Sequence, residues 1–324
     1  MKILVTGSSG FIGTNLAAYL AARGHAVSGL DRVPPRGGAN VASAVCDLLD
    51  AAGVARAVAA CRPEVIIHLA AKTSLKEVPP GSDLYAVNTV GTDHLISAAA
   101  AAGCVRRILH ASTKYVHRGD FPASDRDYQP TTSYGRSKAE MEELIREREG
   151  MVAEWCITRP TTVWGPGMGR HYQDFLRMLE NGRYFHIGHK PVLKHMCYVG
   201  NIVYQYGKLA EAAPGLIHRK VFYLADYEPM VIREWAESLR EALAAPHIRT
   251  LPKSLARGVA LAGDVITRCG YRKFPFTSFR FHNLTDDDVC DASLTREVCG
   301  ELPFTAKEGV RETVVWFKGL AKQA

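Results

Sequence analysis

Long apolar runs are absent from this sequence of 324 residues. None reaches the roughly 18–20 apolar residues that a helix needs to cross a bilayer. The longest candidate, 254–270, is interrupted by Arg257, Asp264 and Arg268. The first residues show no apolar segment followed by a cleavage site, so we expect no secretory signal. The sequence therefore predicts a cytoplasmic protein without a membrane span.

Cysteine pairs and clusters are also missing. The eight cysteines include no CxxC pair and no grouping with histidine of the kind that binds metals. Scattered cysteines in a chain of this length fit reduced thiols better than a disulfide framework. We expect neither a disulfide-rich scaffold nor a metal site.

Positive charge is in excess but is not concentrated. The net charge is +7, yet the chain has no block of Lys and Arg and no nucleic-acid-binding motif. This argues against nucleic acid as a partner and favours a phosphorylated small molecule or an ordinary solvated surface. The content of 47% hydrophobic and 23% charged residues is that of a globular protein.

Short apolar runs alternate with helical patterns through the first half of the chain. The strand-like runs lie at 2–6, 27–30, 41–45, 65–69, 107–111 and 155–158. The helical patterns lie at 11–23, 51–60, 84–102 and 134–149. Such alternation predicts βαβ units and a parallel sheet, and the near-continuous Val, Ile and Leu of the strands indicate a sheet covered on both faces.

The regular alternation stops near residue 165. Further helices are expected at 172–180, 229–245 and 306–318, between irregular stretches. We therefore predict an α/β domain at 1–165 and a smaller substrate-binding region at 166–324. A helix-then-strand pattern at 199–225 predicts a return to the sheet.

A glycine-rich turn joins the first strand to the first helix. Gly7, Gly10 and Gly13 form a G-x-x-G-x-x-G pattern, in which glycines let the backbone approach a pyrophosphate at a helix N-terminus. Asp31 ends the second strand, near the ~20-residue offset of an acid that binds ribose hydroxyls. Its charge favours NAD, while Arg32 beside it leaves NADP open. A tight βα turn without a ligand is the alternative.

A second set of candidate residues opens the helix at 134–149. Tyr134 and Lys138 are four residues apart, so they share one helical face. A nearby ammonium is expected to lower the pKa of the phenol and make it an acid/base for an alcohol or carbonyl. Ser112 and Thr113 end the fifth strand, where open α/β sheets place ligands. Their hydroxyls hold a substrate oxygen or simply cap the strand.

Together these residues resemble the extended short-chain dehydrogenase/reductase family, of the NAD-dependent epimerase/dehydratase type, over nearly the whole chain. Asp47-Leu48 resembles the pair that contacts adenine, His68-Leu69-Ala70-Ala71 the H-L-A-A strand end, and the segment from Asn88 the N-x-x-G-T helix. Thr113 takes the position of the catalytic hydroxyl, and Tyr134 with Lys138 matches Y-x-x-x-K.

The resemblance implies a Rossmann-type, doubly wound parallel sheet and a role for each of these residues. Tyr134 exchanges a proton with the substrate oxygen, Lys138 holds the nicotinamide ribose and Thr113 orients the substrate. A homodimer is implied through a four-helix bundle of the 84–102 and 134–149 helices. The implied NAD contacts are Gly7, Ser9, Gly10, Phe11, Ile12, Gly13, Asp31, Arg32, Asp47, Leu48, Leu69, Ala70, Ala71, Asn88 and Lys138.

Members that act on nucleoside-diphosphate sugars suggest where a substrate would bind. Lys194 stands at the position of an arginine that grips the diphosphate, and Arg280 is the nearest match to a second arginine. Ordinary surface charge is the alternative for both. Thr162 stands where such members often carry Asn. The full set of substrate candidates is Lys72, Tyr115, Thr162, His171, Lys194 and Arg280.

The same resemblance narrows the reaction. Lys114 and Tyr115 stand where 4,6-dehydratases carry Asp-Glu, so we expect no dehydration. What remains is C4 epimerisation, or simple oxidation or reduction, of a nucleoside-diphosphate sugar. Tyr115 and His171 lie near the acid/base positions of epimerase-reductases, which makes epimerisation through a carbon acid a lesser alternative.

Two further functions stay open. The segment 251–254 and the apolar helix after it look like the insert of the 3β-hydroxysteroid dehydrogenase-like branch, whose substrates are sterol-like alcohols. A non-catalytic NAD-binding sensor or scaffold is the third hypothesis. Such proteins commonly lose the tyrosine or the lysine, and this chain keeps both.

Overall fold

The computed structural model describes residues 1–35, 41–74, 76–79, 82–117, 119, 121–268 and 276–321. The chain divides into two compact units. The first unit consists of Met1–Val163, Cys197–Tyr227 and Cys290–Phe304, and the second of Trp164–Met196, Glu228–Val289 and Thr305–Ala324. The glycine-rich turn and the Tyr134–Lys138 pair both belong to the first unit.

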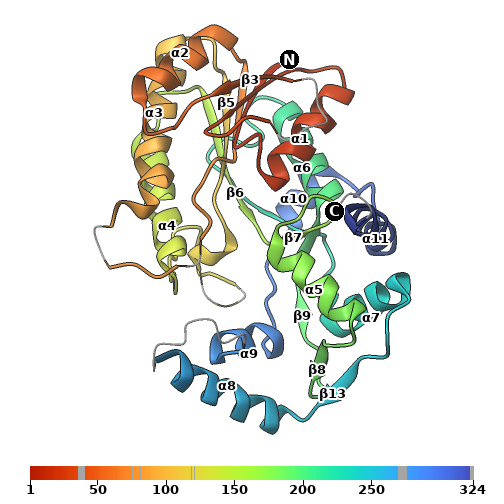
Figure 1. The fold of residues 1–324 in the computed structure, drawn as a ribbon. Coiled ribbons are helices and arrows are strands. Elements are labelled where there is room, and N and C mark those ends of the chain that lie inside the picture. Colours follow the sequence, from red (N-terminus) through yellow and green to blue (C-terminus); the bar gives the residue numbers. More distant parts are fainter. Residues whose placement is uncertain are drawn as a thin grey trace. The chain divides into compact units, whose positions relative to one another are not determined.

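A seven-stranded parallel sheet forms the centre of the first unit (Figure 1). Its strand order is β11-β6-β5-β4-β1-β2-β3, so the order reverses between β1 and β4. The predicted doubly wound, Rossmann-type sheet is thereby confirmed. The strands are β1 (Lys2–Thr6), β2 (Ala26–Asp31), β3 (Ala42–Val45), β4 (Val65–His68), β5 (Arg107–Ala111), β6 (Glu154–Pro160) and β11 (Val221–Leu224).

Helices cover both faces of this sheet. Figure 1 shows α2, α3 and α4 on one face and α1 and α6 on the other. Every residue of β4 and β5 is buried, as expected of central strands in a doubly covered parallel sheet. The helices of the first unit are α1 (Phe11–Ala22), α2 (Ala51–Cys61), α3 (Ala86–Ala102), α4 (Ser133–Glu147), α6 (Val199–Glu211) and α10 (Ser293–Cys299), with short 3₁₀ turns η1 (Asp83–Tyr85) and η2 (Lys114–Val116).

Local capping sets the ends of the helices near the site. The Thr132 side chain accepts a hydrogen bond from Gly135 N at 3.0 Å, which satisfies a free amide at the start of α4. Asp50 does the same for α2 through Gly53 N at 2.9 Å. Gly103, with φ +63°, ends α3 in a left-handed conformation. The start of α4, and with it Tyr134, is therefore set by a local sequence signal.

Two later segments complete the first unit. The chain returns through α6 to β11, which pairs in parallel with β6. Residues 290–304, which the sequence analysis assigned to the substrate-binding region, also belong here. The Thr295 hydroxyl donates to the carbonyl of Tyr223 in β11 at 2.7 Å, so α10 is held on the return strand. This contact joins segments far apart in the sequence, so local patterns do not reveal it.

The second unit combines helices with short strands. Trp235 stacks on Phe175 with ring centroids 5.4 Å apart, and Trp164 meets Trp235 edge-on at 5.5 Å. These rings bring α5 and α7 together. Its helices are α5 (Arg170–Glu180), α7 (Ile232–Leu243), α8 (Lys253–Arg268), α9 (Ser278–Thr285) and α11 (Ala306–Ala321). Its strands are β8 (Phe185–Ile187), β9 (Leu193–Lys194), β12 (Met230–Val231) and β13 (Arg249–Leu251).

Two of the boundaries between the units fall within further short strands, which are β7 (Thr162–Trp164) and β10 (Met196–Tyr198). In the part of the chain that the structure describes, no helix combines the length and the apolar character needed to cross a membrane. The apolar stretch 254–270 corresponds to α8, and its last two residues lie outside the described residues.

Candidate functional site

The candidate site lies at the carboxyl edge of the sheet in the first unit. Thr6 in β1, His68 in β4 and His110 in β5 are register partners across the three strands. The segments that follow these residues therefore leave the sheet at the same edge. They are the glycine-rich turn, Leu69–Ala71 and Ser112–Thr113. Because β1 and β4 flank the reversal of strand order, this edge is where open α/β sheets bind ligands.

Two glycines of the turn have no room for a side chain. Gly7 has φ +70°, and a Cβ there would lie 2.7 Å from Ala70 N. A Cβ on Gly13 would lie 2.1 Å from the carbonyl oxygen of Gly7. Gly10 is looser, with its nearest neighbour at 3.2 Å. The turn is thus held tightly against the end of β4, which explains why this spacing needs glycine.

The N-terminus of α1 is available to an anion. Its N-cap is Gly10, which has no side chain to cap the helix, and the first turn carries no acidic residue. The first amides of the helix and its partial positive charge are therefore not neutralised by the protein. Ser9, Phe11 and Ile12 lie in this turn beside the cap. These features fit the pyrophosphate of a dinucleotide.

Asp31 is positioned by the backbone of the turn. Its Oδ2 accepts a hydrogen bond from Ser9 N at 3.0 Å and its Oδ1 accepts one from Val33 N at 3.2 Å. A carboxylate has about four acceptor positions, so two are left for the hydroxyls of a ribose. Arg32 beside it is exposed. The geometry therefore suits the predicted ribose contact of Asp31.

A buried chain of hydrogen bonds, which the sequence analysis missed, ties the strand ends to α3. The Ala70 amide donates to Thr6 Oγ1 at 3.2 Å, and Thr6 Oγ1 lies 2.7 Å from Nδ1 of His68. The other ring nitrogen of His68 lies 2.9 Å from Thr92 Oγ1, which donates to the carbonyl of Asn88 at 2.8 Å. Since Thr92 uses its proton on Asn88, His68 must donate from Nε2 and accept at Nδ1.

This assignment requires a neutral histidine. Burial, followed by the charges of His110 and Lys138, holds the pKa of His68 well below its usual value. With the proton on Nε2 of the neutral ring, every group in this chain of hydrogen bonds has a partner. His68 therefore links β1, β4 and α3 rather than titrating near neutral pH.

Asn88 holds the segment after β4 against α4. Its Oδ1 accepts from Lys72 N at 2.8 Å, and its Nδ2 donates to the carbonyl of Lys72 at 3.1 Å and to Ser137 Oγ at 2.9 Å. Asn88 thus links the backbone of Lys72 to Ser137, the residue before Lys138. The predicted contact of Asn88 with a cofactor stays a prediction.

Lys138 projects from α4 toward the end of β5. Its Nζ donates to the carbonyl of Ala111 at 2.7 Å and to Met141 Sδ at 3.3 Å. An ammonium has three donors, so one is left for another acceptor. Burial lowers the pKa of Lys138 to about 7, and the charge of Glu142 offsets part of that effect. This is consistent with a lysine that holds a ribose hydroxyl.

Tyr134 is buried, and burial raises the pKa of its phenol; a hydrogen bond with Thr113 lowers it in part. The expectation that Lys138 would lower this pKa was wrong. The ammonium of Lys138 is engaged by the Ala111 carbonyl, and loss of solvation dominates at the phenol. Tyr134 is therefore protonated at neutral pH and able to donate a proton.

Thr113 has the capping role expected of it, and its role toward a substrate stays a prediction. Its Oγ1 accepts a hydrogen bond from Tyr115 N at 3.3 Å and so caps η2, and its hydroxyl also bonds to Tyr134. The ring of Tyr115 meets that of Tyr134 edge-on, with centroids 6.5 Å apart. Ser112 Oγ is buried and has no hydrogen-bond partner in the described part of the chain. Thr113 is thus the hydroxyl that the structure joins to Tyr134.

The predicted adenine pair divides into one exposed and one buried residue. Asp47 is exposed, and its Oδ1 accepts from Leu49 N at 3.0 Å. Leu48 is buried in the core cluster beside α2 and α3, and its carbonyl accepts a hydrogen bond from His94 Nδ1 at 2.9 Å. Asp47 is therefore the member of the pair that is open to a ligand.

The other substrate candidates are spread over the chain. Thr162 is half-buried in β7. His171 is exposed in the first turn of α5, Lys194 pairs through its backbone with Met230 of β12, and Arg280 is exposed on α9. His171, Lys194 and Arg280 belong to the second unit, so their roles toward Tyr134 stay predictions.

A buried ion pair on α4 also escaped the sequence analysis. Arg159 of β6 donates to Glu142 through Nε at 3.0 Å and Nη2 at 2.8 Å, and neither side chain is exposed to solvent. Glu142 follows Tyr134 and Lys138 at the same four-residue interval, so the three lie on one stripe of the helix. That interval is the signal that would have revealed it. The pair joins α4 to β6 of the sheet, on the same stripe of the helix as Tyr134.

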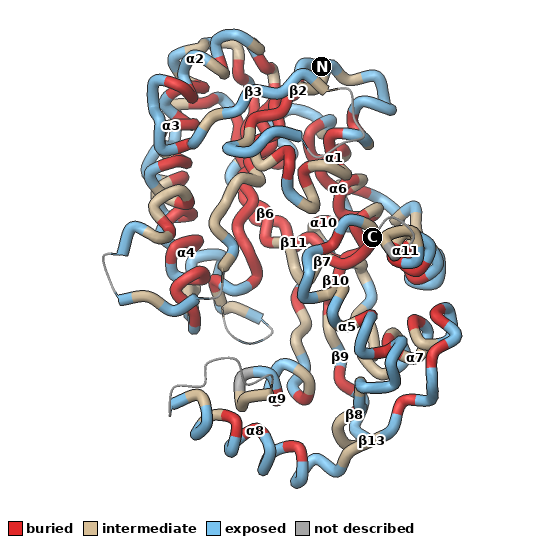
Figure 2. Tube along the Cα trace, in the orientation of Figure 1, coloured by how far each residue is buried: buried red, intermediate tan, exposed pale blue. Residues whose placement is uncertain are grey.

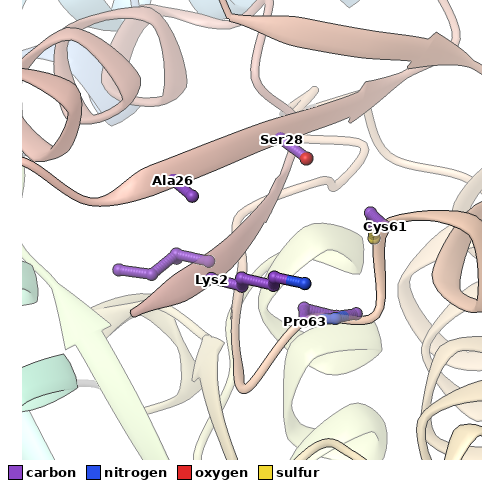
Figure 3. A pocket seen from close by; sticks show the side chains of 6 residues that line it. Lys2, Ala26, Ser28, Cys61 and Pro63 are labelled. Atoms are coloured by element: carbon purple, nitrogen blue, oxygen red, sulfur yellow. The ribbon is translucent and has the colours of Figure 1, made fainter.

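A small cavity of about 200 Å³ lies elsewhere on the first unit. Figure 3 shows its lining by Lys2, Ala26, Ser28, Cys61 and Pro63. Lys2 and Ala26 begin β1 and β2, whereas the glycine-rich turn follows the end of β1. The cavity is therefore at the opposite edge of the sheet from the candidate site.

Comparison with known proteins places this geometry in context. Residues 3–203 match the NAD dependent epimerase/dehydratase family. A relative in a Streptomyces species, a 3-diazoavenalumate denitrifying reductase, is 32% identical over 269 residues, which cover 79% of this chain and 86% of the relative.

Two sugar epimerases resemble the chain along nearly its whole length. The N-acetyl-alpha-D-glucosaminyl-diphospho-ditrans,octacis-undecaprenol 4-epimerase of Escherichia coli O157:H7 is 25% identical over 323 residues, or 97% of this chain and 94% of the relative. The structure of a UDP-glucose 4-epimerase from Thermotoga maritima with UDP-glucose has a TM-score of 0.76 at 21% identity, and the match covers 99% of this chain and 100% of that one. At that identity the second comparison shows a shared fold.

Proposed function

Because this chain belongs to the NAD-dependent epimerase/dehydratase family, we propose that it is an enzyme that transfers hydride at C4 of a nucleoside-diphosphate sugar. NAD is the cofactor of the family. The observation that carries the proposal is the hydroxyl pair Thr113–Tyr134 next to buried Lys138, at the sheet edge that holds the glycine-rich turn. The relative named for 4-epimerisation of a diphospho-linked sugar supports the choice of C4.

The chain's own groups supply the acid/base chemistry of this proposal. Bound NAD would supply the hydride acceptor and donor. Tyr134 gives its proton to the substrate oxygen when the carbonyl is reduced and takes it back when the alcohol is oxidised. Thr113 orients that oxygen, and the free donor of Lys138 binds the nicotinamide ribose. The pyrophosphate binds at the start of α1, and Asp31 binds the adenine ribose.

Lys194 and Arg280 are proposed to bind the substrate diphosphate. Lys194 keeps the positive charge of the arginine that family members acting on nucleoside-diphosphate sugars carry at this position. A lysine cannot, however, form the bidentate hydrogen bonds of a guanidinium. Lys72, Tyr115, Thr162 and His171 are proposed to surround the sugar. Lys114 and Tyr115 offer no carboxylate beside Thr113, so the reaction stops at hydride transfer without loss of water.

The state of the cofactor after purification distinguishes an epimerase from a reductase. An epimerase oxidises its substrate and then reduces it again in one turnover, so it keeps its nicotinamide. We expect protein purified without added cofactor to release NAD on denaturation, and to interconvert C4 epimers of a UDP- or GDP-sugar without added NADH. Steady consumption of added NADH or NADPH by a protein that releases no dinucleotide would support a reductase. A 4-keto-6-deoxy sugar product would contradict the proposal.

A second candidate function is oxidation or reduction of an apolar alcohol or ketone. The resemblance of 251–268 to the steroid dehydrogenase branch favours it. A thermal-shift screen separates the two substrates, because a ligand that binds only the folded protein raises the melting temperature. UDP and GDP are expected to stabilise the NAD-loaded protein. Stabilisation by sterols alone would favour the second candidate.

A further inference from the structure

Helix α8 presents its bulky apolar side chains to solvent. Figure 2 shows the helix exposed along most of its length. Five large apolar residues of α8 are between 37% and 58% exposed: Leu255, Val259, Leu261, Val265 and Ile266. Exposed apolar residues are ordinary when they are scattered, but a contiguous group on one element indicates an interaction surface.

The packed face of α8 carries only small residues. Ala256, Ala260 and Gly263 are buried, and the two alanines pack against Phe281 of α9. At 100° per residue the exposed apolar residues span an arc of roughly 160° on the side away from these small residues. In an ordinary surface helix the large apolar residues face the core and the polar ones face water. Here the arrangement is reversed.

Charged residues border this apolar arc on one side. Arg257 and Arg268 are exposed and fall in the strip between the arc and the packed face. Lys253 lies in the same strip, with its ammonium 6.0 Å from the ring centroid of Phe281 in α9. The single acidic residue of the helix, Asp264, accepts a hydrogen bond from Ser278 N at 3.1 Å and is directed toward α9. The border of the apolar arc is therefore positively charged, in a protein whose net charge is +7.

We propose that α8 docks on an anionic lipid bilayer. Its 16 residues are about 24 Å long, too short and too charged to span the bilayer, so the helix would lie in the interface. A helix with an apolar face bordered by Arg and Lys binds there by burying its apolar side chains and by attracting anionic headgroups. The cationic border favours a lipid bilayer over a second copy of the chain. Two copies that met through α8 would bring their positively charged borders together, and these would repel each other.

Vesicle sedimentation tests the proposal on the full-length, NAD-loaded protein. The probe is a vesicle of phosphatidylglycerol and phosphatidylcholine, compared with phosphatidylcholine alone. We expect binding to the anionic vesicles at low salt, with a loss of roughly fivefold for each arginine in Arg257→Gln and Arg268→Gln. Equal binding of the wild type to both vesicles, or to neither, would overturn the proposal.

A matched pair of variants tests the apolar face. Leu261→Gln with Val265→Gln changes exposed positions of α8, and glutamine keeps the helix. At about fourfold per methylene removed from the lipid, we expect partitioning to fall ~tenfold or more. The control, Leu216→Gln with Val315→Gln, replaces exposed residues elsewhere and should bind as the wild type does.

Two outcomes of this comparison would also overturn the proposal. One is an equal loss of vesicle binding in the control. The other is a change in oligomeric state, by light scattering, in the α8 variant with no change in vesicle binding, which would assign the surface to a second copy of the chain. Neither result depends on turnover, so the test is independent of the proposed reaction.

Discussion

At the scale of single residues, Tyr134 is the proposed acid/base of the reaction. Burial keeps the phenol protonated, and the Thr113 hydroxyl is its hydrogen-bond partner. We expect Tyr134→Phe to bind NAD as the wild type does and to lose turnover by ~10²–10⁴-fold, the usual contribution of a positioned acid/base. Steady-state kinetics and a dinucleotide titration measure the two effects separately. A fully active phenylalanine variant would remove Tyr134 from the mechanism.

Lys138 makes a pH-dependent contribution to stability. Burial lowers its pKa from 10.5 to about 7. Between these values the unfolded chain binds more protons than the native chain, so the free energy of unfolding rises with pH. The charged lysine is thus most destabilising below pH 7, and the effect disappears toward pH 10.5.

Removing this lysine should therefore stabilise the protein more at neutral than at alkaline pH. We expect the stability gained by Lys138→Met, relative to the wild type, to be larger at about pH 7 than at about pH 9.5, by at most on the order of 3 kcal/mol. Urea denaturation at the two pH values measures it. Lys307→Met, at an exposed position, is the control and should show no such difference. An equal gain at both pH values would mean that Lys138 is not buried as a cation.

At the scale of elements, the turn between β1 and α1 has less room for a methyl group at Gly13 than at Gly10. A Cβ on Gly13 would overlap the Gly7 carbonyl at 2.1 Å, whereas on Gly10 the nearest atom is 3.2 Å away. We expect Gly13→Ala to cost about 1–3 kcal/mol and to abolish NAD binding, because the backbone itself must shift. Gly10→Ala should stay within about 0.5 kcal/mol of the wild type. Denaturant titration checks this order, and equal losses would contradict it.

At the scale of the whole molecule, the homodimer implied by the resemblance would depend on the outer face of α4. The exposed positions of the helix are Arg136, Glu140, Glu143 and Glu147, three acids to one base. The homodimer implied by the resemblance would use α3 and α4, and a two-fold axis brings the same stripe of both copies together. Like charges then approach each other, and salt screens them.

We therefore expect the dimer to tighten as ionic strength rises. Sedimentation equilibrium at low and high salt gives the dissociation constant. Glu143→Gln should strengthen the dimer at low salt and reduce the effect of salt. A dimer that is tight at low salt and weakens as salt is added would show that α4 does not form the interface.

The sequence by itself determined the βαβ alternation, the glycine-rich turn and the family. The strands and helices predicted for residues 2–158 lie within about two residues of their predicted ranges, because apolar periodicity and capping are local properties. The family match confirms the resemblance drawn from Gly7, Tyr134 and Lys138. Nucleotide binding could be inferred because a strand, a glycine turn and a helix are consecutive in the chain.

Only the tertiary structure decided what depends on burial and on distant segments meeting. The raised pKa of Tyr134 follows from its burial, which overrides the local effect expected of Lys138. The hydrogen-bond chain through His68 and the ion pair of Glu142 with Arg159 join strands to helices that are separated along the sequence. The orientation of the apolar face of α8 could likewise not be predicted from the sequence. Its apolar residues are visible in the sequence, but only packing shows that the small residues face α9 and the large ones face solvent.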